Sequence, residues 1–306
     1  MSRFSAAFGV CALLTGVLAA AGCSSADPVV GDGCVGESAE ALKICAKATT
    51  LNGIDVSSYQ GTVNWSQVKG AGKQFAFARI SDGLNSVDSK FATNWPAMKA
   101  AGVVRGSYQF FRPSQDPAAQ AQLVVDKLAA AGGLEPGDLP PVLDLESADG
   151  LAGSVVVAKA NIWLKKIEDK LKVKPLIYTA AFMSEVIGTG FGSYALWVAN
   201  YATTCPTMPS GWTDWHFWQS SDTGKVAGIA GAVDTDFFNG TLPQLQALTV
   251  ADATPPKPGS PDTGKAVIDG NILPSGDAPN DGSQGATLGS GTPSQETTSA
   301  PITPCR

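Results

Sequence analysis

The stretch Pro140-Pro141-Val142-Leu143-Asp144-Leu145-Glu146 is the most informative in this 306-residue chain. An apolar run enters it, and two carboxylates close it at alternate positions. Side chains alternate between the two faces of a strand, so Asp144 and Glu146 project to the same side, with Cα atoms roughly 6.6 Å apart. Two carboxyl groups this close beside apolar neighbours do not ionise independently, and one keeps its proton when a free Glu has lost it. Such a pair suits cleavage of a glycosidic bond, whereas the alternative is a strand end with two solvated acids.

Short apolar runs on both sides of this stretch predict a series of strands that alternate with helices. The predicted strands are Gly53–Val56, Phe75–Ile80, Val103–Phe110, Pro141–Leu145, Leu176–Tyr178, Leu196–Ala199, His216–Gln219 and Val233–Phe237. Apolar residues at helical spacing predict helices over Asp116–Ala131 and Val155–Leu171, the second with Ser154 as N-cap. This alternation predicts an α/β fold with a largely parallel sheet closed into, or approaching, a (β/α) barrel. The last strands follow one another too closely for intervening helices, so the barrel is expected to be irregular.

Two further acids stand at the ends of predicted strands. Asp55 closes the first strand, and Asp234 lies near the end of the last one. The first and last strands of a closed barrel are neighbours, so Asp55 and Asp234 are expected side by side. Active sites of such barrels lie at the C-terminal ends of the strands. Together with Asp144 and Glu146, these residues predict a catalytic cluster of four acids.

Aromatic and amide residues follow the same strand ends. The candidate substrate-binding residues are Tyr59, Gln60, Tyr108, Phe110, Tyr178, Trp197, Asn200, Tyr201, Trp218 and Gln219. Sugar rings stack their apolar faces on aromatic side chains, and their hydroxyl groups hydrogen-bond to Asn, Gln and Asp. Trp95 and Trp163 fall on helical segments and are interpreted as core residues.

Seven blocks of the sequence resemble, in order, the glycoside hydrolase family 25 lysozymes of the Chalaropsis type. The resemblance covers roughly residues 51–248. The blocks are Gly53–Gly61 with Val63–Trp65, Phe77–Gly83, Gly102–Phe110, Leu143–Glu146, Leu196–Tyr201, Trp218–Ser221 and Val233–Phe238. The resemblance implies a barrel of eight strands with fewer helices than a full TIM barrel. It also implies cleavage of the β-1,4 bond between N-acetylmuramic acid and N-acetylglucosamine in peptidoglycan.

The resemblance also assigns roles to the acids. Glu146 is implied to be the general acid that protonates the leaving oxygen. Asp144 is implied to orient the substrate's N-acetyl group or to stabilise developing charge, and Asp55 and Asp234 to line the subsite. One position departs from many relatives, in which a His follows the Tyr that Tyr108 matches, because this chain has Gln109 there. Alternation faces Gln109 away from Tyr108, so we interpret it as structural, and His216 as a packed residue of the rim.

Two other functions compete with that of a muramidase. A barrel could bind glycan without turning it over, although a lectin has no need of a buried acid at Glu146. A chitinase-like glycosidase could also carry Asp-x-Glu at a strand end, but that motif has further acids upstream, where Pro140 and Val142 stand here. The proposed chemistry requires no metal and no cofactor.

The two ends of the chain differ in composition from its middle. Residues 1–22 combine a basic start with a short apolar run and predict an export signal. Cys23, after Ala20-Ala21-Gly22, resembles a bacterial lipoprotein cleavage site, which implies lipidation of Cys23 and a cell-envelope location, with the outer membrane as one candidate; plain secretion is the alternative. Residues 23–50 form an N-terminal segment, residues 51–250 the barrel, and residues 251–306 a Pro-, Gly-, Ser- and Thr-rich tail predicted to be disordered.

Cysteine content and net charge limit the kinds of cross-link, metal site and partner that the chain can have. Cys34 and Cys45 flank a short segment and are the pair predicted to form a disulfide in an exported protein, while Cys205 and Cys305 are left over and could pair with each other. The cysteine spacings match no zinc site, and the chain has one histidine. A net charge of −6 without a basic stripe argues against nucleic acid. We expect a monomer that acts on peptidoglycan strands and meets a membrane only through the lipid anchor.

Overall fold

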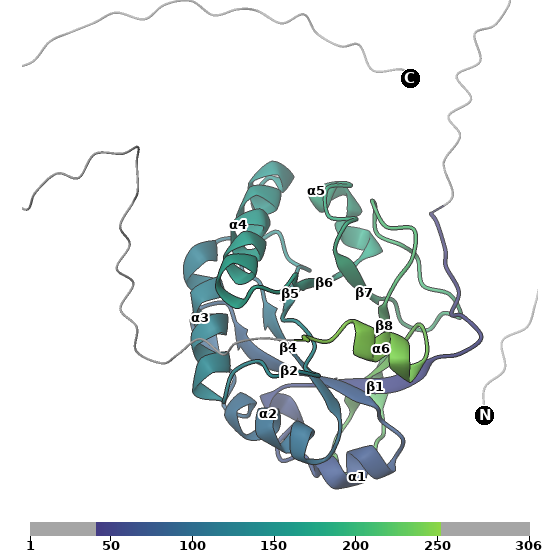
Figure 1. The fold of residues 1–306 in the computed structure, drawn as a ribbon. Coiled ribbons are helices and arrows are strands. Elements are labelled where there is room, and N and C mark those ends of the chain that lie inside the picture. The colour runs from purple at the N-terminus through teal and green to yellow at the C-terminus, as the bar shows by residue number, and fades with distance from the viewer. Residues whose placement is uncertain (1–40, 252–306) are drawn as a thin grey trace, which may run out of the picture. The chain divides into compact units, whose positions relative to one another are not determined.

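A computed structural model describes residues 41–251 of the chain, which form a closed barrel (Figure 1). Eight strands make the barrel wall, and a two-residue strand, β3 (Ser86–Val87), extends β2 at one edge. The wall strands are β1 (Leu51–Val56), β2 (Phe75–Asp82), β4 (Val104–Phe110), β5 (Val142–Asp144), β6 (Leu176–Ala180), β7 (Ala195–Ala199), β8 (Phe217–Gly224) and β9 (Val233–Phe238). All eight predicted strands are confirmed, and the fold is the irregular α/β barrel that the sequence predicts.

Strand β1 closes the barrel because it pairs with both ends of the strand order. It runs parallel to β2 and antiparallel to β9. The β8–β9 pair is a hairpin, so β9 alone runs against the other seven wall strands. The beginning of β9 therefore lies at the rim where the parallel strands end.

Helices cover the barrel unevenly. They are α1 (Trp65–Gly70), α2 (Phe91–Ala100), α3 (Pro117–Ala130), α4 (Gly153–Leu171), α5 (Ser184–Ile187) and α6 (Leu242–Ala247), with 3-10 turns η1 (Ser58–Gln60) and η2 (Ala181–Met183). No helix separates β7 from β8 or β8 from β9, which confirms the expected irregularity. Within residues 41–251, no helix has both the length and the apolar character to cross a bilayer.

The two predicted helices are present as α3 and α4, with one correction. Asp116 caps α3, because its side chain accepts a hydrogen bond from the backbone of Ala119 at 2.8 Å. The prediction of Ser154 as N-cap of α4 is wrong: the helix begins at Gly153, Ala152 occupies the cap position, and no side chain caps it. Tertiary packing holds α4 instead, since one face is buried, including Trp163 and Leu164.

Aromatic rings fill the interior of the barrel below its mouth. Phe75, Phe77 and Phe217 pack edge to face, and Trp197 stacks on Phe77 with ring centroids 4.3 Å apart. Gly53 of β1 leaves room for this cluster, because a Cβ atom there would lie 2.3 Å from the Phe75 ring. A second layer of buried apolar residues lies between the barrel wall and its helices, and includes Trp95 and Trp163 as predicted.

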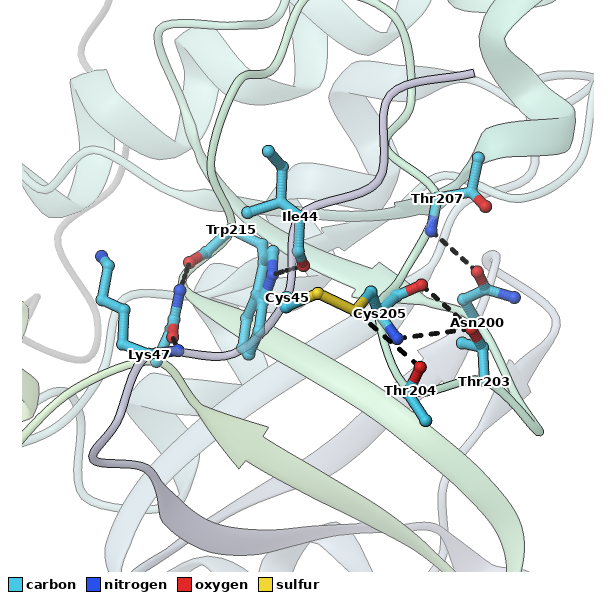
Figure 2. Close-up of a disulfide and its surroundings, with 10 residues drawn as sticks. Ile44, Cys45, Lys47, Asn200, Thr203, Thr204, Cys205, Thr207 and Trp215 are labelled. Atoms are coloured by element: carbon cyan, nitrogen blue, oxygen red, sulfur yellow. Dashed lines mark hydrogen bonds between the residues drawn. A yellow bond between two sulfur atoms is a disulfide. The ribbon is translucent and has the colours of Figure 1, made fainter. Parts of the chain in front are cut away.

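The N-terminal segment is attached to the barrel by a disulfide between Cys45 and Cys205 (Figure 2). The prediction that Cys45 pairs with Cys34 is therefore wrong. Backbone hydrogen bonds join the segment to the β7–β8 loop at Ile44 and Pro206, and the Trp215 indole donates to the carbonyl of Ile44 at 2.8 Å. Residues 1–40 and 252–306, with the predicted signal, Cys23, Cys34, Cys305 and most of the tail, lie outside the described residues.

The disulfide is expected to contribute substantially to stability, because it links residues 160 positions apart and so restricts the unfolded chain. Replacing both Cys45 and Cys205 with Ser should lower the free energy of unfolding by about 2–4 kcal/mol. Urea unfolding of the two proteins measures this difference. A reductant should reproduce the loss in the wild type and have little effect on the double variant. Equal urea midpoints for wild type and variant would show that the Cys45–Cys205 disulfide contributes nothing to stability.

Candidate active site

A pocket of about 460 Å³ opens at the C-terminal ends of the parallel strands. Its lining is polar and aromatic. The lining residues are Asp55, Ser57, Tyr59, Gln60, Arg79, Asp82, Tyr108, Phe110, Asp144, Glu146, Tyr178, Trp197, Tyr201, Gln219 and Asp234. All four predicted catalytic acids are therefore brought together in one cavity. Eight of the ten predicted substrate-binding residues line it with them.

A larger hollow of about 700 Å³ lies at the opposite end of the barrel, before β6, β7 and β8. Its single acidic residue is Asp214, which pairs with Lys47 at 2.9 Å. His216 also lines this hollow, so the prediction that places it at the rim beside the acids is wrong. Among the described residues, the lining of this hollow therefore lacks the acid pair on which the predicted chemistry depends.

Asp144 is the last residue of β5, and Glu146 follows just beyond the strand end. Asp144 is only 5% exposed, and its Oδ1 atom is buried without a hydrogen-bond partner. Glu146 is half-buried and lines the same pocket. The two-residue spacing thus places a buried carboxyl group beside a more accessible one, as alternation along the chain predicts.

Asp55 and Asp234 form a second pair, because they occupy directly opposed positions of β1 and β9. This confirms that they lie side by side, but Asp234 stands near the beginning of β9, not near its end. The Gln219 amide nitrogen donates to Asp55 at 2.7 Å and to Asp234 at 3.3 Å. Its amide oxygen accepts from the hydroxyls of Tyr178 at 2.8 Å and Tyr201 at 2.5 Å. One amide from β8 therefore fixes two acids and two tyrosines around the pocket.

Burial raises the pKa of each of the four acids. The pKa of Asp144 lies well above its ordinary value because the group is desolvated and faces Glu146. Burial likewise raises the pKa of Glu146, while Arg112 and the Tyr178 hydroxyl oppose the rise. The pKa of Asp55 is raised well above the ordinary value by burial and then by Asp236 and Asp234. The cluster therefore holds protons at a pH where exposed carboxyl groups have lost theirs.

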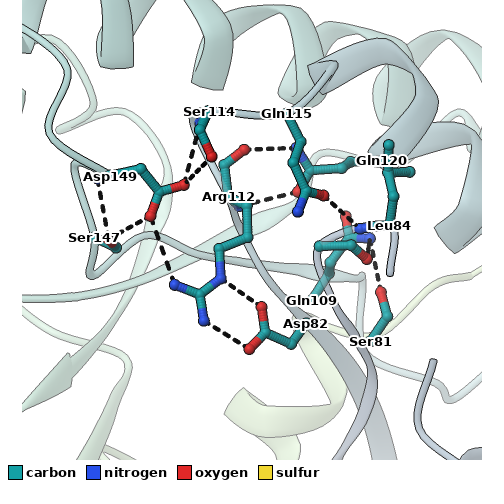
Figure 3. Close-up of polar contacts among 11 residues, drawn as sticks. Ser81, Asp82, Leu84, Gln109, Arg112, Ser114, Gln115, Gln120, Ser147 and Asp149 are labelled. Carbon is teal, nitrogen blue, oxygen red and sulfur yellow. Dashed lines mark hydrogen bonds and ion pairs between the residues drawn. The ribbon is translucent and has the colours of Figure 1, made fainter. Parts of the chain in front are cut away.

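Arg79 and a fifth acid, Asp82, line the pocket, and Arg112 contacts Asp82 and Phe110, although the sequence analysis did not select these three residues. Arg112 donates to both oxygens of Asp82, at 2.5 and 2.7 Å, and its guanidinium lies 3.5 Å from Asp149 (Figure 3). The same guanidinium stacks over Phe110, 4.1 Å from the ring centre. Arg79 lies over the Tyr59 ring, 5.2 Å from its centre. These cations oppose the negative charge of the pocket and support two of its aromatic rings.

Two predicted substrate-binding residues lie outside the pocket lining. The Asn200 side chain accepts a hydrogen bond from the backbone of Thr207, so it closes the β7–β8 loop. The Trp218 indole donates to the Asn200 carbonyl at 2.7 Å and packs against Trp215 and Phe237 in the outer layer. Their neighbours Trp197, Tyr201 and Gln219 do line the pocket.

Gln109 has the structural role that the sequence predicts. It is fully buried, donates to Ser81 at 2.9 Å and accepts from the Trp163 indole at 2.7 Å. Its side chain thus connects β4 with β2 and α4 on the outer face of the wall. An amide suits this position, because both of its hydrogen-bonding groups are used.

Asp236 lies beneath the pocket and was not selected from the sequence. It is 1% exposed, opposes Gly53 across the β1–β9 pair, and accepts from the Trp197 indole at 3.0 Å. Its other oxygen, Oδ2, has no hydrogen-bond partner. Burial first, and then Asp234, raise the pKa of Asp236 well above its ordinary value, while Trp197 and Lys73 oppose the rise. Asp236 therefore holds the Trp197 ring in the floor of the pocket and adds another acid with a raised pKa to the cluster.

The fold and the acid cluster agree with comparisons to known proteins. The family model described as Glycosyl hydrolases family 25 matches residues 54–229, which is more than half of the chain. The chain belongs to glycosyl hydrolase family 25.

Relatives of this family 25 enzyme include Lysozyme M1 of Streptomyces globisporus, which is 36% identical over 216 residues, 66% of this chain and 72% of that protein. N,O-diacetylmuramidase of Chalaropsis sp. is 32% identical over 221 residues, 65% of this chain and 99% of that protein. The crystal structure of the bacterial lysozyme from Streptomyces coelicolor superposes with a TM-score of 0.61 at 35% identity, covering 66% of this chain and 98% of that one.

The raised pKa of Asp236 in this family 25 barrel predicts a pH-dependent effect on stability. Because folding favours the protonated form, the contribution of Asp236 is complete below the ordinary Asp pKa and is lost as the pH rises through the raised value. Asp236→Asn keeps an acceptor for Trp197 and removes this loss. Relative to wild type, its free energy of unfolding should therefore increase as the pH is raised from acidic to neutral, measured by urea unfolding at a series of pH values.

Asp236→Leu is the matched comparison, because it removes both the charge and the acceptor. It leaves the buried Trp197 N–H without a partner, which should cost about 1–3 kcal/mol at low pH. A difference between Asp236→Asn and wild type that is the same at every pH would contradict the assignment.

Proposed function

We propose that this family 25 glycosyl hydrolase is a lysozyme that cleaves the β-1,4 bond between N-acetylmuramic acid and N-acetylglucosamine in peptidoglycan. The observation that supports it best is the pair Asp144 and Glu146 in an aromatic-floored pocket, with the pKa of both raised. Glycosidic bond cleavage depends on such a pair of carboxyl groups with different environments. The names of the Streptomyces and Chalaropsis relatives support the substrate.

Glu146 is proposed to be the general acid. It is the more accessible member of the pair, so its carboxyl group can reach a leaving oxygen in the pocket, and its raised pKa keeps the proton that it must donate. Asp144 lies deeper and is proposed to stabilise the positive charge that develops on the sugar. This role requires the anion of Asp144, which burial and Glu146 disfavour and which Arg79 favours by opposing the rise in the pKa.

Asp55 and Asp234 are proposed to bind the substrate on the opposite side of the pocket. Gln219 holds both carboxyl groups through its amide nitrogen, so their free oxygens are oriented before substrate enters. The tyrosines bound to the same amide, Tyr178 and Tyr201, offer rings and hydroxyls to a sugar. The Gln219 side chain thus links the orientation of the two acids to the positions of the two tyrosine rings.

Of the two alternative functions, the geometry argues against a barrel that only binds glycan. A barrel that only binds glycan would gain nothing from burying several carboxyl groups whose charged forms are costly. A chitinase-like enzyme would cleave between N-acetylglucosamine units, and the identity of the new reducing end separates that activity from a muramidase.

The protein is proposed to act outside the cytoplasm, held to the cell envelope by a lipid on Cys23 or secreted. The disulfide between Cys45 and Cys205 supports export, because such bonds persist in oxidising compartments. Metabolic labelling with a palmitate analogue, for wild type beside Cys23→Ser, tests the anchor.

Glu146→Gln should abolish hydrolysis while glycan binding remains, because Gln keeps the size of the side chain but cannot donate the acid proton. The rate should fall by about 10²- to 10⁴-fold. Purified peptidoglycan is digested, the products are reduced with borohydride, and mass spectrometry identifies the new reducing end. Reduced muramic acid from the wild type alone supports the proposed bond and acid.

Glu168→Gln serves as the control, since the new amide on α4 can still accept the bond that Tyr194 donates to Glu168 at 3.1 Å. Reduced glucosamine from the wild type would instead indicate a glucosaminidase or chitinase-like specificity. Unchanged turnover in Glu146→Gln would remove this residue from the mechanism.

Asp144→Asn should also lose activity steeply, by about 10²- to 10³-fold, because a neutral amide cannot stabilise developing positive charge. The effect should fall on kcat more than on KM, measured on soluble glycan fragments. Retention of most of the rate would contradict the role given to Asp144 and leave Glu146 to act without it.

A further inference from the structure

Three aromatic side chains within residues 41–251 are strongly exposed. Tyr59 is 85% exposed, Phe182 68% and Tyr201 41%. Each follows the C-terminal end of a parallel wall strand: Tyr59 lies in η1 after β1, Phe182 in η2 after β6, and Tyr201 just beyond β7. The exposed aromatic rings of the described chain therefore gather at the rim that carries the acids.

The strand register brings the turn with Phe182 and the loop with Tyr201 out of the wall as neighbouring segments. Ala180 of β6 pairs with Ala199 of β7, and the two aromatic residues each stand two positions later. Neighbouring strands lie about 4.8 Å apart, so the two chains leave the wall side by side. Tyr178 and Trp197, two residues before the paired alanines, line the pocket. Phe182 does not line the pocket itself, but its turn leaves the wall beside the loop with Tyr201, which does.

Phe182 makes little contribution to the core, unlike its neighbour in the same turn. Met183 is 3% exposed and packs in the outer apolar layer, whereas most of the Phe182 ring faces solvent. The phenyl ring has no polar group to satisfy, so a ligand for it must offer an apolar face.

The barrel order places Tyr59 and Phe182 across the mouth from each other. Around the closed wall of eight strands, β1 and β6 are separated by β9, β8 and β7 on one side and by β2, β4 and β5 on the other. A line from Tyr59 to Phe182 therefore crosses the pocket that holds Asp144 and Glu146. A chain polymer that lies along this line contacts an aromatic ring at both ends of the pocket.

We propose that Phe182 is a glycan-stacking residue that extends the substrate site beyond the pocket on the β6 side, so that the enzyme favours long glycan strands over short fragments. This inference rests on the proposed function. The ligand is a pyranose ring of the same strand, whose apolar face covers the phenyl ring. The bound strand runs across the barrel mouth from Tyr59, over the acids, past Tyr201 to Phe182.

The test compares kcat/KM on long peptide-free glycan strands with kcat/KM on short oligosaccharides from the same strands. Phe182→Ala should lower the ratio of the two values by about 3- to 10-fold, the range expected for loss of one stacking contact. Phe182→Trp should restore the ratio, because it keeps a flat ring. Phe182→Leu should behave like Ala, since it keeps apolar area without a ring face.

Ile162→Ala on α4 is the control, because it removes an apolar side chain that is 48% exposed and that belongs neither to the pocket lining nor to the turn with Phe182. An unaltered ratio in Phe182→Ala, with an active wild type, would overturn the stacking site and leave the proposed function standing. A wild type that cleaves neither long strands nor short fragments would instead contradict the proposed function. Equal recovery with Leu and Trp would show a hydrophobic contact without stacking and also overturn the proposal.

Discussion

The pairing of β1 with both β2 and β9 is the constraint on which the rest of the molecule depends. It closes the wall, so that every wall strand has two neighbours and its backbone groups are paired. It also opposes Asp55 to Asp234 and Gly53 to Asp236. Closure therefore sets three carboxyl groups on one interior surface, two at the mouth and one beneath it.

Concentrating acids in this way is unfavourable for folding and useful for chemistry. Each charged carboxylate resists burial, and neighbouring carboxylates repel one another. The structure offsets this with a limited set of partners: Gln219 at one side of the mouth, Arg79 and Arg112 at the other, and the Trp197 indole below. These contacts do not fully compensate for burial and charge repulsion, so the pKa of the acids stays raised. A glycosidase uses this property.

The mouth of the barrel is shaped by segments that lie outside the regular strands. Tyr59, Phe182 and Tyr201 all stand in turns or loops after strand ends. The loop with Tyr201 also carries Cys205, whose disulfide with Cys45 ties the N-terminal segment to it. Lys47 continues this attachment through Asp214 and Asn239. The Cys45–Cys205 disulfide on one side of the barrel thus restrains a loop that forms part of the pocket lining.

Local patterns in the sequence are enough to predict the eight strands and the four acids. Apolar runs such as Val142–Leu143 end in acids, and alternation at a period of two residues places Asp144 and Glu146 on one side. The same alternation correctly predicts that the Gln109 side chain points out of the barrel. Long-range contacts of the folded chain set three other features: β9 runs against its neighbours, Cys45 bonds to Cys205, and Asn200 and Trp218 turn away from the pocket. Asp236 and Arg112 likewise acquired their roles from groups that lie more than 25 positions away in the chain. Local periodicity cannot encode such contacts, since they arise only when barrel closure brings distant strands together.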